Sequence, residues 1–148
     1  MYNEILVPTD GSPAAEAAID HAIDLAEKYS ARVPGLYVVD ATAFASIDAG
    51  SEMVVEALEQ EGERAVEEVS DRAAAAGVEA ETNVVTGTAY RSILDYVESE
   101  GIDLVVMGTH GRRGIERFLL GSVTERVVRS ADVPVLTVRG KEPEELEE

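Results

Sequence analysis

Short apolar runs alternate along this chain with longer segments of helical periodicity. Leu104–Met107 and Val135–Val138 are short apolar runs of the kind found in strands buried on both faces of a parallel sheet. From Ser51 to Ala76, apolar side chains recur every three or four residues, which predicts a long helix with one buried face. This alternation predicts an α/β domain with a parallel sheet, in which right-handed crossovers place helices on both faces.

Local signals mark the ends of these elements. The pattern predicts strands over residues 2–7, 32–39, 79–85, 104–107 and 135–138. Ser12 before Pro13 predicts the start of the first helix, because serine caps a helix and proline suits the first helical position. Gly77 and Gly101 predict the ends of two later helices.

A glycine-rich loop follows the apolar run Leu104–Met107. Gly108-Thr-His-Gly111 is followed after nine residues by Gly121-Ser122, and Ser122-Val-Thr-Glu125 fits a capping box with Ser122 as the N-cap. The predicted order is therefore strand, glycine-rich loop and helix N-terminus. Such an arrangement holds phosphate through exposed N–H groups and the positive end of the helix dipole.

The local charge agrees with an anion site. The chain has a formal net charge of −18, yet residues 108–129 hold five arginines against two glutamates, a local net of +3. Those arginines are Arg112, Arg113, Arg117, Arg126 and Arg129. A basic segment beside a helix start in an acidic protein favours an anion site, and the alternative is a solvated helix face with ordinary surface arginines.

Three segments in order resemble the universal stress protein family, in its ATP-binding type. They are the first strand with its aspartate turn (residues 5–12), the glycine-serine signature (residues 108–122) and the closing segment (residues 130–138). The resemblance implies one doubly wound, Rossmann-like domain over residues 1–140, with a five-stranded parallel sheet in the order 3-2-1-4-5. Residues 141–148 are expected to form an acidic, disordered tail.

The resemblance also implies a nucleotide site, with ATP or another adenine nucleotide as ligand and Mg²⁺ left open. Its expected residues are Pro8, Thr9, Asp10, Val38, Val39, Met107, Gly108, His110, Gly111, Arg112, Gly121, Ser122 and Val123. Asp10 is expected to accept hydrogen bonds from the ribose or adenine side, the alternative being an Asx-turn. Val38 and Val39 are expected to offer backbone groups while their side chains join the core.

No catalytic residue is assigned. His110 has no serine–aspartate or metal partner at a meaningful spacing, and there is no G-x-x-x-x-G-K-[ST] loop. We therefore expect a regulatory or sensory binding protein. A slow ATPase or phosphotransfer enzyme on the same site, and a dimeric stress protein that binds no nucleotide, remain the alternatives. The resemblance further implies a homodimer that pairs through Val135–Val138.

Composition limits the remaining classes. The chain of 148 residues suits one domain, and it has no cysteine, so disulfides and thiolate metal sites are excluded. No apolar run reaches membrane-spanning length and no signal-peptide pattern is present, so we expect a cytoplasmic protein. The charge argues against nucleic-acid partners. Its 30 acidic residues against two lysines lead us to expect a halophilic protein, adapted to high salt.

Overall fold

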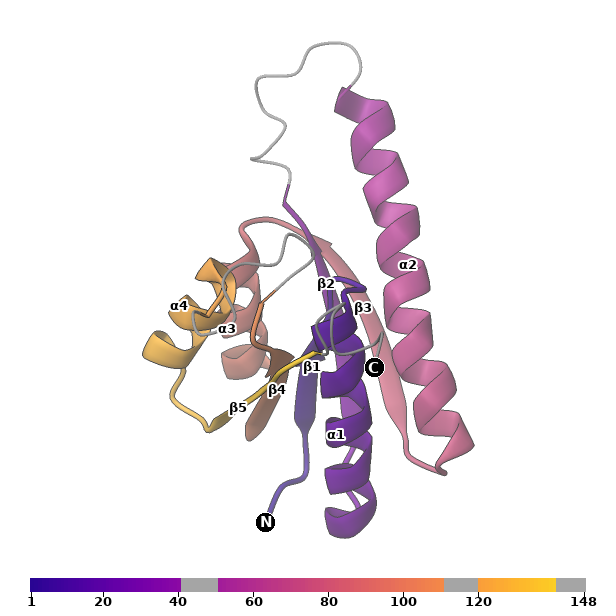
Figure 1. The fold of residues 1–148 in the computed structure, drawn as a ribbon, viewed down its shortest axis with the longest axis vertical. Coiled ribbons are helices and arrows are strands. Elements are labelled where there is room, and N and C mark those ends of the chain that lie inside the picture. Colours follow the sequence, from indigo (N-terminus) through magenta and orange to yellow (C-terminus); the bar gives the residue numbers. More distant parts are fainter. Residues whose placement is uncertain (41–50, 111–119, 141–148) are drawn as a thin grey trace, which may run out of the picture.

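Strands and helices alternate along the whole described chain (Figure 1). A computed structural model describes residues 1–40, 51–110 and 120–140. The elements in chain order are β1 (Ile5–Pro8), α1 (Pro13–Tyr29), β2 (Val33–Val39), α2 (Ser51–Ala75), β3 (Ala80–Thr86), α3 (Ala89–Ser99), β4 (Leu104–Gly108), α4 (Ser122–Ser130) and β5 (Val135–Val138). Within these ranges, no helix has the length and apolar character needed to cross a membrane.

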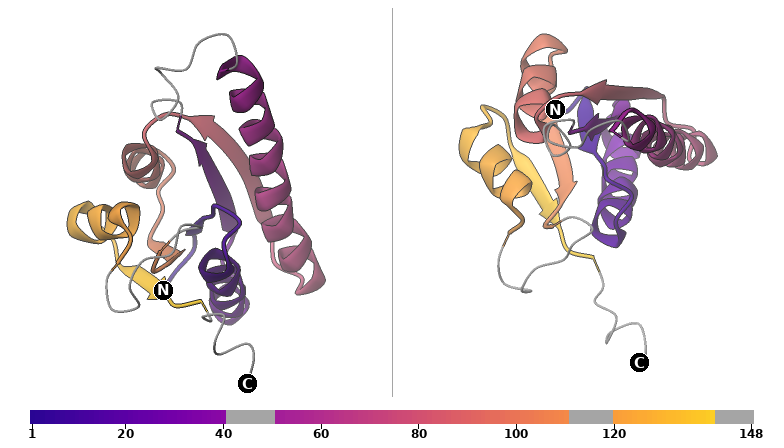
Figure 2. Two further views of the ribbon diagram at one scale, coloured as in Figure 1. Left: turned by 45° about the horizontal axis from the view of Figure 1, so that its top comes forward. Right: turned by 90° about the horizontal axis from the view of Figure 1, so that it is seen from above.

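The five strands form one parallel sheet in the order β3-β2-β1-β4-β5. Helices α1 and α2 cover one face, and α3 and α4 cover the other (Figures 1 and 2). This confirms the doubly wound fold with the strand order 3-2-1-4-5. The order reverses at β1, which has β2 on one side and β4 on the other, and ligands of such sheets bind where the order reverses.

The core has two main layers because side chains of a strand alternate between the faces of the sheet. Ile5 and Val7 pack with Ala18 of α1, whereas Leu6 packs on the opposite face with Val127 of α4. All five side chains are fully buried. The buried face of α1 is mostly alanine, so this helix can lie close to the sheet.

Two of the predicted helix boundaries are confirmed in detail. Ser12 is the N-cap of α1, where its hydroxyl accepts a hydrogen bond from the Ala15 N–H at 3.2 Å, and Pro13 is the first helical residue. Gly77 follows the end of α2 with a φ of +72°, which a residue with a side chain rarely adopts. The Val78 N–H then bonds back to the Ala73 carbonyl at 2.8 Å, which ends the helix.

The strands predicted over residues 32–39, 79–85 and 104–107 are shifted by one residue at one or both ends, and two other strand predictions need a larger correction. The first strand begins at Ile5 rather than at residue 2, because Glu4 forms only an isolated bridge with Arg32. The last strand has the predicted bounds but is only partly buried: Val138 is buried, whereas Leu136, on the same face of the strand, is 39% exposed. The physical reason is that β5 forms the edge of the sheet, beside β4.

Candidate nucleotide pocket

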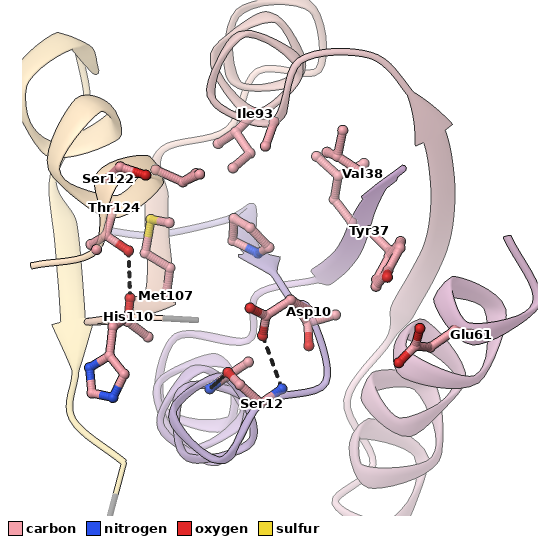
Figure 3. Close-up of a pocket in the computed structure, with 18 of the residues that line it drawn as sticks. Asp10, Ser12, Tyr37, Val38, Glu61, Ile93, Met107, His110, Ser122 and Thr124 are labelled. Atoms are coloured by element: carbon pink, nitrogen blue, oxygen red, sulfur yellow. Dashed lines mark hydrogen bonds between the residues drawn. The ribbon is translucent and has the colours of Figure 1, made fainter. Parts of the chain in front are cut away.

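A pocket of about 510 Å³ opens beyond the carboxyl ends of β1, β2 and β4 (Figure 3). Ser122 and Thr124 lie on one side of it, Tyr37 and Val38 lie on the other, and Asp10 lies between them. Small-molecule sites commonly measure roughly 300–1,000 Å³, so the pocket has room for a ligand of nucleotide size.

Ten of the thirteen residues that we expected in a nucleotide site line this pocket. They are Pro8, Thr9, Asp10, Val38, Met107, Gly108, His110, Gly121, Ser122 and Val123. Val39 does not line it: its side chain is fully buried against Val66 of α2, and its carbonyl accepts the Gly87 N–H at 2.9 Å. Gly111 and Arg112 lie outside the described residues. Sequence segments that lie far apart in the chain therefore meet at one cavity.

Asp10 forms the Asx-turn that was the alternative to its ligand role. One carboxylate oxygen, Oδ1, accepts the Ser12 N–H at 2.9 Å, and the Thr9 hydroxyl accepts the Gly11 N–H at 3.1 Å. The Thr9 N–H in turn donates to the Leu36 carbonyl of β2 at 2.9 Å. These bonds fix the turn while Asp10 still lines the pocket, so the two roles are compatible at this position.

The start of α4 differs from the predicted capping box. Gly121 is the N-cap and Ser122 is the first helical residue, and no side chain caps the helix. The Gly121 N–H donates to the Thr109 carbonyl at 2.8 Å. The first N–H groups of an α-helix have no partner within the helix, so the donors that α4 can offer to the pocket are those of Ser122, Val123 and Thr124.

Thr124 anchors this helix start, and sequence reasoning missed it. Its side chain is buried, and its hydroxyl donates to the Gly108 carbonyl at 2.8 Å. The first turn of α4 is thereby tied to the last residue of β4. The sequence did indicate a polar side chain here, because Thr124 lies within the expected capping box Ser122–Glu125. We had assigned the capping role to the Ser122 hydroxyl instead.

Gly108 and Gly121 of the signature each make room for a different neighbour. A Cβ on Gly108 would lie 2.8 Å from the Ala14 Cβ and 2.9 Å from the Ala14 carbonyl carbon, so this glycine lets α1 approach β4. A Cβ on Gly121 would lie 3.1 Å from the His110 Cα. The φ of Gly121 is −63°, so its conformation does not itself require glycine. Close packing, rather than an unusual backbone angle, explains both positions.

Apolar side chains line the remainder of the pocket. Leu36, Ile93 and Leu58 join the expected Val38 and Met107, and together they come from the sheet, α2 and α3. Such a surface suits the flat faces of a base. Sequence reasoning had assigned the Val38 side chain to the core, since an apolar residue at a strand end gives no sign of whether it faces a helix or a cavity.

Tyr37 and Glu61 are further lining residues that the sequence did not indicate. Tyr37 precedes Val38 on β2, and Glu61 reaches the pocket from α2 (Figure 3). The α2 backbone passes close to Tyr37 at Gly62, where an added Cβ would lie 2.5 Å from the tyrosine Cδ1. This close approach brings Glu61 to the same side of the pocket as Tyr37. The two residues belong to different elements, so the periodicity within either element does not predict that they are neighbours.

His110 lines the pocket, and its Nδ1 lies 3.1 Å from the Thr109 hydroxyl. Among the described residues there is no group of three or more histidine, cysteine, aspartate or glutamate side chains placed to hold a metal ion. The geometry therefore assigns His110 a place in the pocket wall, beside Gly121.

The sequence and the fold of this chain are similar to those of known proteins. The sequence profile of the universal stress protein family matches residues 1–139. A universal stress protein of Methanocaldococcus jannaschii is 42% identical over 141 residues, which cover 94% of this chain and 83% of that protein.

Solved structures give the same relationship. A second Methanocaldococcus jannaschii universal stress protein, solved as a hypothetical protein whose biochemical function was assigned from its structure, matches with a TM-score of 0.85. It is 32% identical, and the match covers 96% of this chain and 99% of that one. A universal stress protein solved in complex with cAMP matches with a TM-score of 0.71 and 28% identity, covering 95% and 99% of the two chains.

Proposed function

The chain belongs to the universal stress protein family, and from this membership we propose that it binds an adenine nucleotide, with ATP as the first candidate. Binding would make it a nucleotide-dependent regulatory or sensory module. The observation that carries the proposal is the meeting of the Asp10 turn and the uncapped start of α4 at one pocket. A related structure holds cAMP, which is itself an adenine nucleotide.

The residues of the pocket fit the three parts of such a ligand. Leu36, Val38 and Ile93 offer an apolar surface for the base. Asp10 offers a carboxylate, which accepts hydrogen bonds from hydroxyl groups such as those of ribose. The N–H groups of Ser122 and Val123, at the positive end of the α4 dipole, suit phosphate. Mg²⁺, where it is present, would bind chiefly through the phosphates and water.

The first experiment asks what the purified protein carries. Denaturing the protein and analysing the released small molecules by mass spectrometry should yield an adenine nucleotide. Calorimetry on nucleotide-free protein in high salt with Mg²⁺ should then show ATP binding with micromolar-range affinity. No released nucleotide, together with no heat and no thermal shift at millimolar ATP, would favour a stress protein that binds no nucleotide. Turnover of labelled ATP would instead favour the slow ATPase.

Two substitutions at Asp10 separate its ligand role from its turn. Asp10→Asn keeps a side-chain oxygen for the Ser12 N–H, whereas Asp10→Ala loses it. Losing a hydrogen bond to a charged group costs roughly 1.5–3 kcal/mol, or about ten- to a hundredfold in affinity. Both variants should therefore bind ATP more weakly, and only Asp10→Ala should also lose thermal stability. Normal ATP binding by Asp10→Asn would reject the ligand role of the Asp10 carboxylate and leave Asp10 only its structural role in the turn.

A homodimer through β5 is part of the same proposal. β5 is an edge strand, and Leu136 on β5 and Val128 on α4 expose 39% and 44% of their surface. An apolar edge strand tends to associate unless it is covered. Leu136→Lys should shift the protein toward monomer in analytical ultracentrifugation, whereas a wild-type protein that sediments as a monomer contradicts the dimer.

A further inference from the structure

Helices α3 and α4 pack together (Figure 2). Where they meet, two arginines lie beside one tyrosine. The guanidinium carbon of Arg126, on α4, lies 4.4 Å from the centre of the Tyr90 ring, on α3. Arg91 hydrogen-bonds the Tyr90 hydroxyl. We refer to Tyr90, Arg91 and Arg126 as the α3–α4 corner.

Tyr90 and Arg126 stand close in the sequence to residues that line the pocket, although the corner is not itself part of the lining. Tyr90 stands between Ala89 and Ile93, which both line the pocket. Arg126 stands four residues after Ser122, another lining residue, and residues four apart share one face of a helix. Helical side chains also lean toward the helix N-terminus, so the long Arg126 side chain covers the turn nearest to the pocket.

The arginines of the corner differ from three other arginines in their ion pairs with described residues. Arg32, Arg72 and Arg129 all form ion pairs with acidic side chains. Within the described ranges, neither Arg91 nor Arg126 has an acidic side chain within ion-pair distance. In a chain with 30 acidic residues, two arginines side by side make this corner locally positive.

Two helix starts add to this positive potential. The N-cap residues of α3 and α4 are Thr88 and Gly121, and neither helix has a side-chain cap. The first turn of α3 contains no acidic residue, and the one in the first turn of α4, Glu125, pairs with Arg129. The positive ends of both helix dipoles therefore add to the two arginine charges at the corner.

The acid–base behaviour of Tyr90 agrees with this charge. The pKa of its phenol is lowered, first by the hydrogen bond from Arg91, with burial acting in the opposite direction and the charges of Arg91 and Arg126 adding to the effect. Glu61 lies across the pocket from α4, and Asp10 lies between them. Across the pocket, the electrostatic potential therefore favours an anionic group at the α3–α4 side.

We propose that the α3–α4 corner binds the terminal phosphates of the nucleotide, so that the pocket prefers a nucleoside triphosphate over the monophosphate. This inference rests on the proposed function, and it adds a subsite outside the glycine-serine signature. The first phosphate meets the N–H groups at the start of α4, and a longer phosphate chain extends to Arg126 and Arg91. Asp10 and Glu61 repel phosphate and thereby set the direction of the ligand.

The test compares ATP with AMP by calorimetry on wild type, Arg126→Gln and Arg129→Gln. The control removes the same charge from the same helix, but Arg129 is paired with Glu125, whereas it is Arg126 that lies over the Tyr90 ring. Arg126→Gln should weaken ATP binding by about tenfold or more, since it removes a charge-assisted hydrogen bond, and should change AMP binding little. Arg129→Gln should leave the ratio of the two affinities unchanged.

Two results would overturn the corner while leaving nucleotide binding in place. One is a wild type that binds ATP and AMP equally well, and the other is an equal loss of both ligands in Arg126→Gln. If no nucleotide binds, inorganic tripolyphosphate serves as a probe that tests the corner without a base. A thermal shift with tripolyphosphate that Arg126→Gln removes and Arg129→Gln keeps supports the corner even then, whereas no shift in the wild type rejects it together with the proposed function.

Discussion

A single methyl group at Gly140 is expected to destabilise the protein from outside the pocket. Gly140 is buried, two residues after the end of β5. A Cβ at this position would lie 2.6 Å from the Ala14 backbone nitrogen and 2.7 Å from the Ala14 Cα. Both distances are shorter than real Cβ contacts, and both involve main-chain atoms of the first turn of α1. Gly140→Ala therefore forces α1 and the end of the sheet apart.

The expected loss can be estimated from the cost of overpacking. An extra methyl group in a well-packed site costs roughly 1–3 kcal/mol. In a domain of about 150 residues, each kcal/mol lowers the melting temperature by roughly 2–4 °C, so Gly140→Ala should lower it by about 2–12 °C. The turn that holds Asp10 leads directly into α1, so the affinity for ATP should fall as well.

Thermal unfolding followed by circular dichroism measures this loss, with Arg139→Ala as the control because the Arg139 side chain is exposed. A second comparison tests the geometry itself. Gly108→Ala should also destabilise, and Ala14→Gly should partly rescue it, because the nearest obstacle to that methyl is the Ala14 Cβ. Ala14→Gly should not rescue Gly140→Ala, whose obstacles are backbone atoms. An unchanged melting temperature in Gly140→Ala, or equal rescue of both variants, would refute this packing argument.

Three further predictions concern single contacts and the charge of the chain. Thr124→Val leaves the buried Gly108 carbonyl without its 2.8 Å donor and should cost about 1–3 kcal/mol in urea unfolding, whereas Thr124→Ser should keep the bond. Burial and the charges of Glu81 and Glu100 raise the pKa of the Tyr96 phenol from 10.0 to about 12. The stability that this shift contributes is therefore complete below pH 10.0 and is lost as the pH rises toward about 12. The free energy of unfolding should fall over this pH range in the wild type, and Tyr96→Phe should remove this fall. The melting temperature should rise from low salt to molar KCl, as the Debye length falls from about 10 Å at 0.1 M to about 3 Å at 1 M, and no rise would contradict the high-salt interpretation.

The fold was predictable because its signals are local. Strands such as Leu104–Met107 are short apolar runs, and the Ser12–Pro13 and Gly77 signals mark helix ends through the conformations of single residues. The strand order was not predictable from these patterns, since pairing depends on contacts between distant segments, and only the family resemblance supplied it. The exposure of Leu136 follows from that order, because it is the edge position of β5 that uncovers this side chain.

The parts of the candidate site that were predictable from the sequence are those where a turn or a helix start has a recognisable residue pattern. The Asp10 turn and the Gly121-Ser122 helix start carry such features, and both line the pocket. Glu61, which lines the pocket, carries none, and neither does Tyr90 of the proposed α3–α4 corner. Glu61 reaches the pocket only because α2 passes close to Tyr37, and Tyr90 meets Arg126 only because α3 and α4 pack together. Contacts between helices on a sheet depend on their packing, which the spacing of residues within one helix does not specify.

The glycine-serine signature illustrates how one sequence pattern can serve two physical needs. Gly108 makes room for α1, which leads out of the Asp10 turn, and Gly121 begins α4 beside His110. The Thr124 hydroxyl then donates to the Gly108 carbonyl. Gly108 therefore both allows the close approach of α1 and holds the start of α4. A change at Gly108 therefore disturbs the ribose side and the phosphate side of the proposed site together. Loss of nucleotide binding in a Gly108 variant would not, by itself, place a phosphate beside Gly108.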